Sequence, residues 1–168
     1  MKAFTAVISQ YIAQFASWLI FIMMLLTVTT VVLRYGFNVG SIAIQEMANY
    51  CHASAFLIAA AFTLRCDEHV RVDIFYAKMN STQQAWVNAL GVLFLMMPFV
   101  LFLLYASGHY FWAAWVIKES SVEAGGLPFV YALKFMIPFS MLLLLLEAIQ
   151  LFASSAKCIV FPQQGEQT

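Results

Sequence analysis

Four long apolar stretches constrain this chain more than any other feature of its sequence. Each has about the 20 residues that a helix needs to cross the hydrocarbon core of a bilayer. Backbone N–H and C=O groups in lipid must be satisfied within the segment, so helices are the expected form. We predict an all-α integral membrane protein, with a single four-helix membrane domain over residues 1–168. Its transmembrane helices are expected at about 12–33, 42–64, 85–106 and 128–153.

The composition indicates that lipid is the main solvent. Hydrophobic residues make up 64% and charged residues 10% of the 168 residues, whereas a soluble domain carries roughly a quarter charged residues. Four spans leave no room for a soluble domain with an aqueous active site, so we do not expect an enzyme. Eight basic residues are balanced by eight acidic ones. No basic surface is therefore available for nucleic acid, and we expect no nucleic-acid partner.

The cysteines and the first residues give no sign of a cofactor or of processing. Cys51, Cys66 and Cys158 form neither a CxxC pair nor a metal-ligand spacing, so we expect packing residues and no metal or cofactor. The first residues lack a small-residue cleavage pattern ahead of the apolar stretch. The first helix is therefore expected to stay in the protein.

The connection between the second and third spans, residues 65–82, holds the densest cluster of charge. Its first part reads RCDEHVRVD, from Arg65 to Asp73, and its second part mixes apolar residues with Lys78. This mixture suits a short amphipathic helix lying in the membrane interface. Two interpretations of the charged part stay open: a solvated turn whose ion pairs contribute little each, or a segment needed for docking or folding.

The end of the third span is ambiguous. Pro98 removes one backbone donor and predicts a kink. Beyond Gly108 an aromatic segment continues to residue 117, so the helix is either long and tilted or broken into a short interfacial piece. The polar stretch from Lys118 to Pro128 contains a Gly-Gly turn signal and places Pro128 at the start of the fourth helix.

Positive charges beside the spans predict the orientation, because Lys and Arg are held preferentially on the cytoplasmic side. With four spans, both termini lie on one side. That side collects Lys2, Arg65, Arg71, Lys78 and Lys157, and the other collects Arg34, Lys118 and, if it reaches that side, Lys134. We therefore expect both termini in the cytoplasm.

Glu46 and Arg34 are ionisable groups close to one membrane face. Glu46 lies in the first turns of the second helix, where the positive end of the helix dipole favours an acid, and Arg34 ends the preceding helix. Ionisable groups at membrane depth usually pair, so we predict a Glu46–Arg34 ion pair that pins this hairpin. The alternative is a contact with a proton or a substrate.

One side of the second helix is polar or small. At about 100° per residue, its polar side chains fall within an arc of roughly 120°, together with two alanines. These residues are Gln45, Glu46, Asn49, His52, Ala53 and Ala60. Lipid is a poor neighbour for such a face, whereas another helix can hydrogen-bond to it and approach closely. We predict that this face contacts protein.

The charges of the fourth helix lie near its two ends. Lys134 can extend to the outer interface, and Glu147 and Gln150 share a face near the other end. Lys134 and Glu147 are separated by roughly 20 Å along the axis, so each needs an interface or a partner of its own. The central third of every span is almost devoid of acids, which argues against an independent ion pump or proton channel.

Two histidines raise a different class of protein. His52 and His109 are the candidate haem ligands of a cytochrome or membrane-anchor subunit of a respiratory enzyme. Haem ligands must oppose each other at one depth, but His109 lies near the end of its span and His52 two to three turns into its own. Hydrogen bonding to a carbonyl or to interfacial water is the simpler interpretation of each histidine. A self-contained small exporter is a third class, which the lack of a charged central pathway disfavours.

The polar features follow each other in a distinctive order. The first span is followed by Arg34, a short loop and Glu46, and the second span runs into FTLRCDEHVRVD, residues 62–73. The later EAGGLP, residues 123–128, precedes Lys134 and Pro138. This order resembles the small membrane subunit, the Q-type or DctQ-like family, of tripartite ATP-independent periplasmic (TRAP) transporters. Arg65 and the run from His69 to Asp73 match that family's Arg followed by a His-Val-x-Val-Asp-like segment.

The resemblance implies a subunit of a secondary transporter in the bacterial inner membrane. In that family a larger membrane subunit carries the substrate and sodium sites and moves as an elevator, and a periplasmic substrate-binding protein delivers the substrate, usually an organic acid. The small subunit would then be a non-catalytic scaffold, and membrane lipids are further expected partners. Candidate structural or subunit-interface residues are Arg34, Glu46, Asn49, His52, Arg65, His69, Arg71, Asp73, Lys134 and Glu147. We expect the charged segment, residues 65–73, and the amphipathic segment that follows it to hold the scaffold at a fixed depth against the moving large subunit.

Overall fold

The computed structural model describes residues 2–65 and 79–160, and most of this part of the chain is helical. The elements are α1 (Lys2–Gly36), α2 (Ile42–Arg65), α4 (Ser81–Gly91), the π-helical turn η1 (Val92–Met96), α5 (Met97–Val116) and α6 (Val130–Val160). Within the described residues, four helical stretches are long and apolar enough to cross a membrane. The predicted all-α fold with four transmembrane helices is confirmed. Most of the predicted interfacial segment, residues 66–78, lies outside the described residues.

Two helices extend beyond the apolar stretches that predicted them. α1 begins at Lys2 rather than near residue 12, and α6 continues to Val160 rather than ending near residue 153. An apolar stretch marks the part of a helix that lies in hydrocarbon, whereas backbone hydrogen bonds can continue the helix into the polar interface. The hydropathy pattern therefore predicts the span and not the helix ends.

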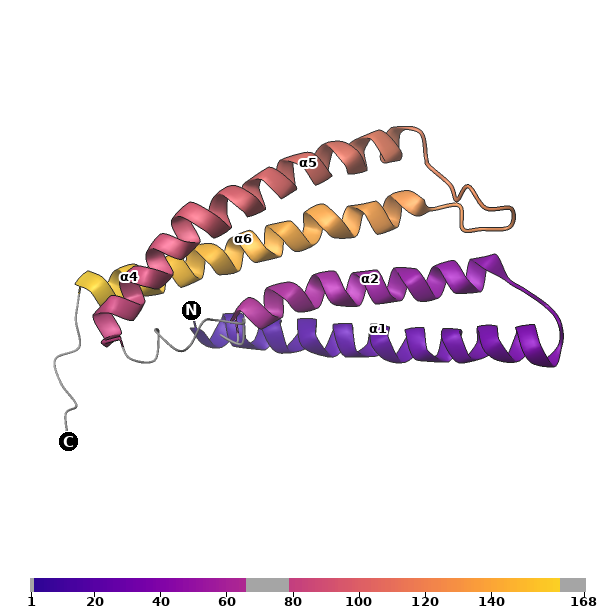
Figure 1. The fold of residues 1–168 in the computed structure, drawn as a ribbon, viewed down its shortest axis with the longest axis horizontal. Coiled ribbons are helices and arrows are strands. Elements are labelled where there is room, and N and C mark those ends of the chain that lie inside the picture. Colours follow the sequence, from indigo (N-terminus) through magenta and orange to yellow (C-terminus); the bar gives the residue numbers. More distant parts are fainter. Residues whose placement is uncertain (1, 66–78, 161–168) are drawn as a thin grey trace.

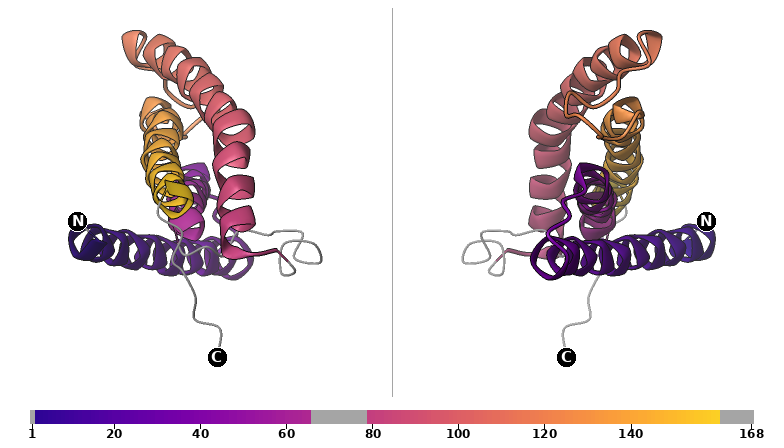
Figure 2. Two further views of the ribbon diagram at one scale, coloured as in Figure 1. Left: turned by 90° about the vertical axis from the view of Figure 1, so that its left-hand side faces the viewer. Right: turned by 90° about the vertical axis from the view of Figure 1, so that its right-hand side faces the viewer.

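The third span is one long, curved helical stretch. It runs without interruption from α4 through η1 into α5, from Ser81 to Val116, so the helix continues past Gly108 (Figure 2). The π-helical turn ends at Met96, two residues before Pro98, which is the second residue of α5. The N–H of Met97 donates to the C=O of Val92. A π-helical turn next to a proline is a common cause of helix bending.

The helices form an open row rather than a closed bundle. Their order across the row is α5, α6, α2 and α1, with α2 packed between α1 and α6, and α6 packed against α4 and α5 (Figure 1). Viewed along the other helices, α1 crosses them obliquely (Figure 2). Only 6% of the apolar window of α1 is buried, against 29% for α2. α1 therefore leaves most of its surface to lipid or to another protein.

Small side chains line the helix contacts. The buried residues of α2 include Ala48, Cys51 and Ala55, and those of α6 include Ser140 and Ala148, both 0% exposed. Without a hydrophobic driving force in lipid, helices associate where small residues let their backbones approach closely. The buried hydroxyl of Ser140 donates to the C=O of Ile137 at 3.0 Å, so it needs no partner on another helix. Cys51 is buried and free, as expected for a packing residue.

The outer surface of the third span is strongly apolar. Phe94, Phe99, Phe102 and Tyr105 are 62–70% exposed. A soluble protein rarely leaves such a patch in water. Such a surface suits hydrocarbon, as in a multi-pass membrane protein.

Candidate functional site

Polar side chains gather at one end of the row, which we call the loop end. It contains the α1–α2 connection (residues 37–41) and the α5–α6 loop (residues 117–129), which lie near each other in Figure 1. Two polar arrangements lie here. One fastens the α5–α6 loop to α2 and α6, and the other lines a hollow between α1 and α2.

Glu46 fastens the α5–α6 loop to the first turns of α2. Its Oε2 accepts a hydrogen bond from the backbone N–H of Leu127 at 2.7 Å, and its Oε1 accepts one from the Ser121 hydroxyl. Both donors belong to the same loop, so a single carboxylate closes a contact between distant parts of the chain. Charge-assisted hydrogen bonds of this kind are stronger than neutral ones.

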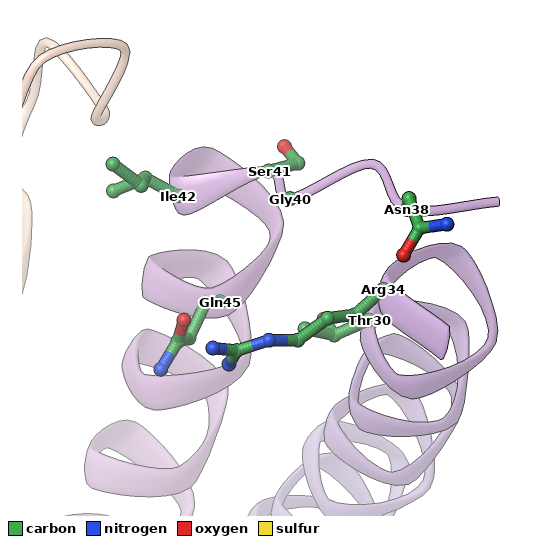
Figure 3. Close-up of a pocket in the computed structure, with 7 residues that line it drawn as sticks. All are labelled: Thr30, Arg34, Asn38, Gly40, Ser41, Ile42 and Gln45. Carbon is green, nitrogen blue, oxygen red and sulfur yellow. The ribbon is translucent and has the colours of Figure 1, made fainter. Parts of the chain in front are cut away.

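The predicted Glu46–Arg34 ion pair is wrong. Both Glu46 oxygens face the α5–α6 loop, whereas Arg34 extends from α1 toward Gln45 (Figure 3). Gln45 and Glu46 are adjacent, and successive helix positions point about 100° apart. Arg34 therefore faces the side of α2 that carries Gln45. Glu46 lies on another side of α2, which faces α6 and the α5–α6 loop.

The two glycines of the α5–α6 loop are required for different reasons. Gly125 has φ +82°, a left-handed conformation that glycine adopts without strain. Gly126 approaches the Glu46 contact so closely that an added Cβ would lie 2.5 Å from the Cβ of Ser121 and 2.9 Å from Oε1 of Glu46. The Gly-Gly pair read as a turn signal in the sequence thus also makes room for the carboxylate.

The loop is internally hydrogen-bonded, which places its two donors side by side. The N–H of Ser121 donates to the C=O of Leu127 at 2.9 Å, and the N–H of Gly126 donates to the C=O of Glu123 at 3.0 Å. The hydroxyl oxygen of Ser121 also accepts from the N–H of Glu123 at 3.2 Å. The Ser121 hydroxyl therefore donates to Glu46 while accepting from its own loop.

Lys134 provides the second attachment of the loop. Its Nζ lies 2.5 Å from Oε2 of Glu119 and 4.0 Å from the ring centroid of Tyr110. The ammonium group thus connects α6 to the loop and to α5. Sequence reasoning selected Lys134 but missed Glu119 and Ser121, because nothing in their spacing distinguishes them from solvated loop residues.

The turn out of α5 carries a second cation–aromatic contact. Lys118 has φ +49°, and the N–H of Glu119 donates back to the C=O of Ala114 at 3.0 Å, which satisfies an end carbonyl of α5. The Lys118 ammonium lies 3.3 Å from the ring centroid of Trp115. The loop therefore leaves the helix in a defined direction.

The polar face predicted on α2 is divided in the structure. Glu46 contacts the loop, whereas Asn49 and His52 are exposed, so residues 2–65 and 79–160 do not bury these two side chains in the predicted protein contact. His109 is exposed on α5 and lies against Tyr105, with the ring centroids 4.7 Å apart. Because α6 packs between α2 and α5, the two histidines do not oppose each other across a haem-sized site (Figure 1).

The remaining candidate residues divide into two groups. Glu147 is partly buried on α6 and takes part in a side-chain interaction. Arg65 is the last residue of α2, and His69, Arg71 and Asp73 lie outside the described residues. Within residues 2–65 and 79–160, no group of three or more His, Cys, Asp or Glu side chains is placed to hold a metal ion.

The hollow between α1 and α2 has a volume of about 470 Å³. It is lined by Thr30, Arg34, Asn38, Gly40, Ser41, Ile42 and Gln45 (Figure 3). A second hollow of about 310 Å³ adjoins it and shares Thr30, Arg34 and Gln45. Its other lining residues, which include Thr27, Val31 and Ala48, extend the space along the groove between the helices.

One protein-family model matches the chain. It describes the DctQ component of tripartite ATP-independent periplasmic transporters and matches residues 23–158. The match includes α2, the α5–α6 loop and Lys134, and thus every contact of the loop with Glu46 and Lys134. A search of curated proteins and a search of solved structures found no match.

Proposed function

Because the chain belongs to the DctQ component family of tripartite ATP-independent periplasmic transporters, we propose that this small transporter subunit is a non-catalytic scaffold for the large membrane subunit. The complex would carry out sodium-coupled uptake of an organic acid delivered by a periplasmic binding protein. We place the chain in the bacterial inner membrane with both termini in the cytoplasm. The loop end then faces the periplasm.

The observation that carries the proposal is the placement of charge. No Asp, Glu, Lys or Arg occurs between Lys2 and Arg34, between Glu46 and Arg65, between Ser81 and Val116, or between Lys134 and Glu147. Moving an ion or a charged substrate through a membrane protein usually requires ionisable groups along the route. In the described helices, Glu147 alone among these charged residues lies near the middle of a helix. This sparse placement, together with the open row of helices, supports a static role rather than a conduit.

We propose the exposed side of α2 as a contact surface for the large subunit. His52 is exposed at membrane depth. Most of the surface of the neighbouring helix α1 is also exposed. A polar side chain in hydrocarbon gains from a hydrogen-bonding partner on another helix. The large subunit would supply that partner and cover part of α1.

The charged segment, residues 65–73, keeps its proposed role in holding the scaffold at a fixed depth. Replacement of His69, Arg71 and Asp73 together by alanine should weaken association with the large subunit and reduce uptake. Unchanged association and unchanged uptake would contradict that role.

Co-purification with the large subunit tests the scaffold proposal. A tagged chain should retain the large subunit, His52→Trp should reduce that retention because the bulky ring fills the contact, and His109→Trp on α5 is the matched control. If the wild-type chain retains no large subunit, the scaffold proposal fails. If the two tryptophan variants behave alike, the α2 side is not the contact surface. A purified chain with a Soret band would instead support the cytochrome alternative.

A further inference from the structure

Arg34 is the cationic side chain of the hollow between α1 and α2. It belongs to the last turn of α1, and its guanidinium extends across the hollow toward Gln45 (Figure 3). Among the residues that the structure describes, no carboxylate pairs with it, since Glu46 is bound to the α5–α6 loop. A guanidinium stays charged at any physiological pH. The hollow therefore carries one uncompensated positive charge.

The lining of the hollow also contains neutral hydrogen-bond donors. The side-chain amides of Asn38 and Gln45 line the hollow, and that of Asn49 lines the adjoining one. Each amide has two N–H donors, and the planar guanidinium matches two oxygens of a phosphate group. These groups together favour an anion with several acceptor oxygens.

The space below Arg34 is lined more by apolar than by polar surface, although the Asn49 amide also lies there. Thr27 and Thr30 line the groove, but their hydroxyls donate to backbone carbonyls of α1 at 2.8 Å. Val31 and Ala48 line the same space, and Val28 is 55% exposed on α1 nearby along the helix. A polar, positively charged end that continues into an apolar groove suits a ligand with an anionic head and a hydrocarbon chain.

We propose that this hollow binds the phosphodiester headgroup of an anionic phospholipid of the phosphatidylglycerol type, with an acyl chain along the α1–α2 groove. The hollow lies at the end of the apolar part of α1, at the level where phosphate groups of a bilayer are found. No carboxylate lines it to accept the ammonium group of phosphatidylethanolamine. The single positive charge is therefore matched best by a lipid with one net negative charge.

This lipid site is independent of the scaffold function. His52 lies seven residues from Gln45, or roughly 10 Å deeper along α2, so the proposed partner contact and the headgroup site occupy different levels of the helix. The isolated chain should bind the lipid whether or not the large subunit is present.

Native mass spectrometry of the full chain tests the site. The chain would be taken from nanodiscs of equal parts phosphatidylglycerol and phosphatidylethanolamine into a mild detergent, and retained lipid would be counted. The wild-type chain should retain phosphatidylglycerol in preference. Arg34→Gln should lower that retention roughly 10-fold, because it removes a charge-assisted, two-point contact. Lys118→Gln is the matched control, since Lys118 carries a charge at the loop end but lies outside the hollow.

Two further measurements keep the result interpretable. Arg34→Lys retains the charge without the planar fork, so it should bind an intermediate amount. Spin-labelled phosphatidylglycerol with the unaltered chain should show an immobilised fraction that unlabelled phosphatidylglycerol displaces and phosphatidylethanolamine does not.

Equal retention by the wild type and Arg34→Gln, equal loss in the Lys118→Gln control, or displacement by both lipids alike would overturn the assignment. So would a complex in which Arg34 crosslinks to an acidic side chain of the large subunit and no phosphatidylglycerol is retained.

Discussion

The backbone N–H of Leu127 donates to Oε2 of Glu46 at 2.7 Å, although 81 positions separate the two residues in the chain. This bond joins the loop that precedes α6 to the first turns of α2. α2 and α6 are also the central pair of the row (Figure 1). The loop end is therefore fastened at the same pair of helices that holds the row together.

Removal of the Glu46 carboxylate should release the α5–α6 loop. Glu46→Ala leaves two loop donors without their acceptor, so the free energy of unfolding in mixed detergent micelles should fall by about 1–3 kcal/mol. Glu46→Gln keeps one carbonyl acceptor and should lie between the alanine variant and the wild type. Glu123→Gln, at an exposed residue of the same loop, is the control. Equal stability of Glu46→Ala and the wild type would show that the contact contributes nothing.

The loop should lose its fixed position when Gly126 gains a side chain. The new Cβ would fall within 2.5 Å of the Cβ of Ser121, so the loop must move away from Glu46 in Gly126→Ala. A spin label at Val122, which is fully exposed, should then become more mobile. Gly91→Ala is the matched control, because an added Cβ there meets nothing within 4 Å. A label equally immobile in both variants would contradict the close approach.

The Lys134–Glu119 pair should be energetically coupled. The side chains are 13% and 32% exposed, so water screens the pair less than at an open surface. A double-mutant cycle with Lys134→Met and Glu119→Gln should give a coupling of roughly 1 kcal/mol in unfolding free energy. The same cycle with Lys157, at the other end of α6, in place of Lys134 should give no coupling. A zero coupling for the first cycle would mean that the pair does not attach the loop.

A larger side chain at the centre of α6 should disturb the helix contacts. Ala148 is 0% exposed, so Ala148→Leu adds volume where the helices are in contact and should destabilise the protein by about 1–3 kcal/mol. Ile149→Leu, at a neighbouring residue that is 47% exposed, should have little effect. Thermal unfolding in detergent measures both variants, and an equally stable Ala148→Leu protein would place the helix contact elsewhere.

The sequence predicts the spans well because hydrocarbon imposes a simple length and polarity rule. It also places Glu46 and Lys134 near helix ends. Their partners are not predictable in the same way: the choice between Arg34 and the α5–α6 loop depends on which side of α2 each neighbouring helix occupies.

The order of the helices in space cannot be predicted from the sequence either. Apart from α2, the spans of this protein are apolar on nearly every side, so hydropathy does not mark the contact side of those helices. Small residues such as Ala48 and Ala148 mark the contacts only once the helices are placed in space. The same limit applies to Asn49 and His52, whose polarity predicts a protein contact but which are exposed in the part of the chain that the structure describes.

The central claim is that this chain supports transport without conducting the substrate, and reconstituted uptake tests it most directly. Proteoliposomes would contain this chain alone, the large membrane subunit alone, or both, with the binding protein, a sodium gradient and a panel of radiolabelled organic acids. We predict uptake only when both membrane subunits are present. Substrate uptake by this chain alone, or full uptake by the large subunit without it, would contradict the account.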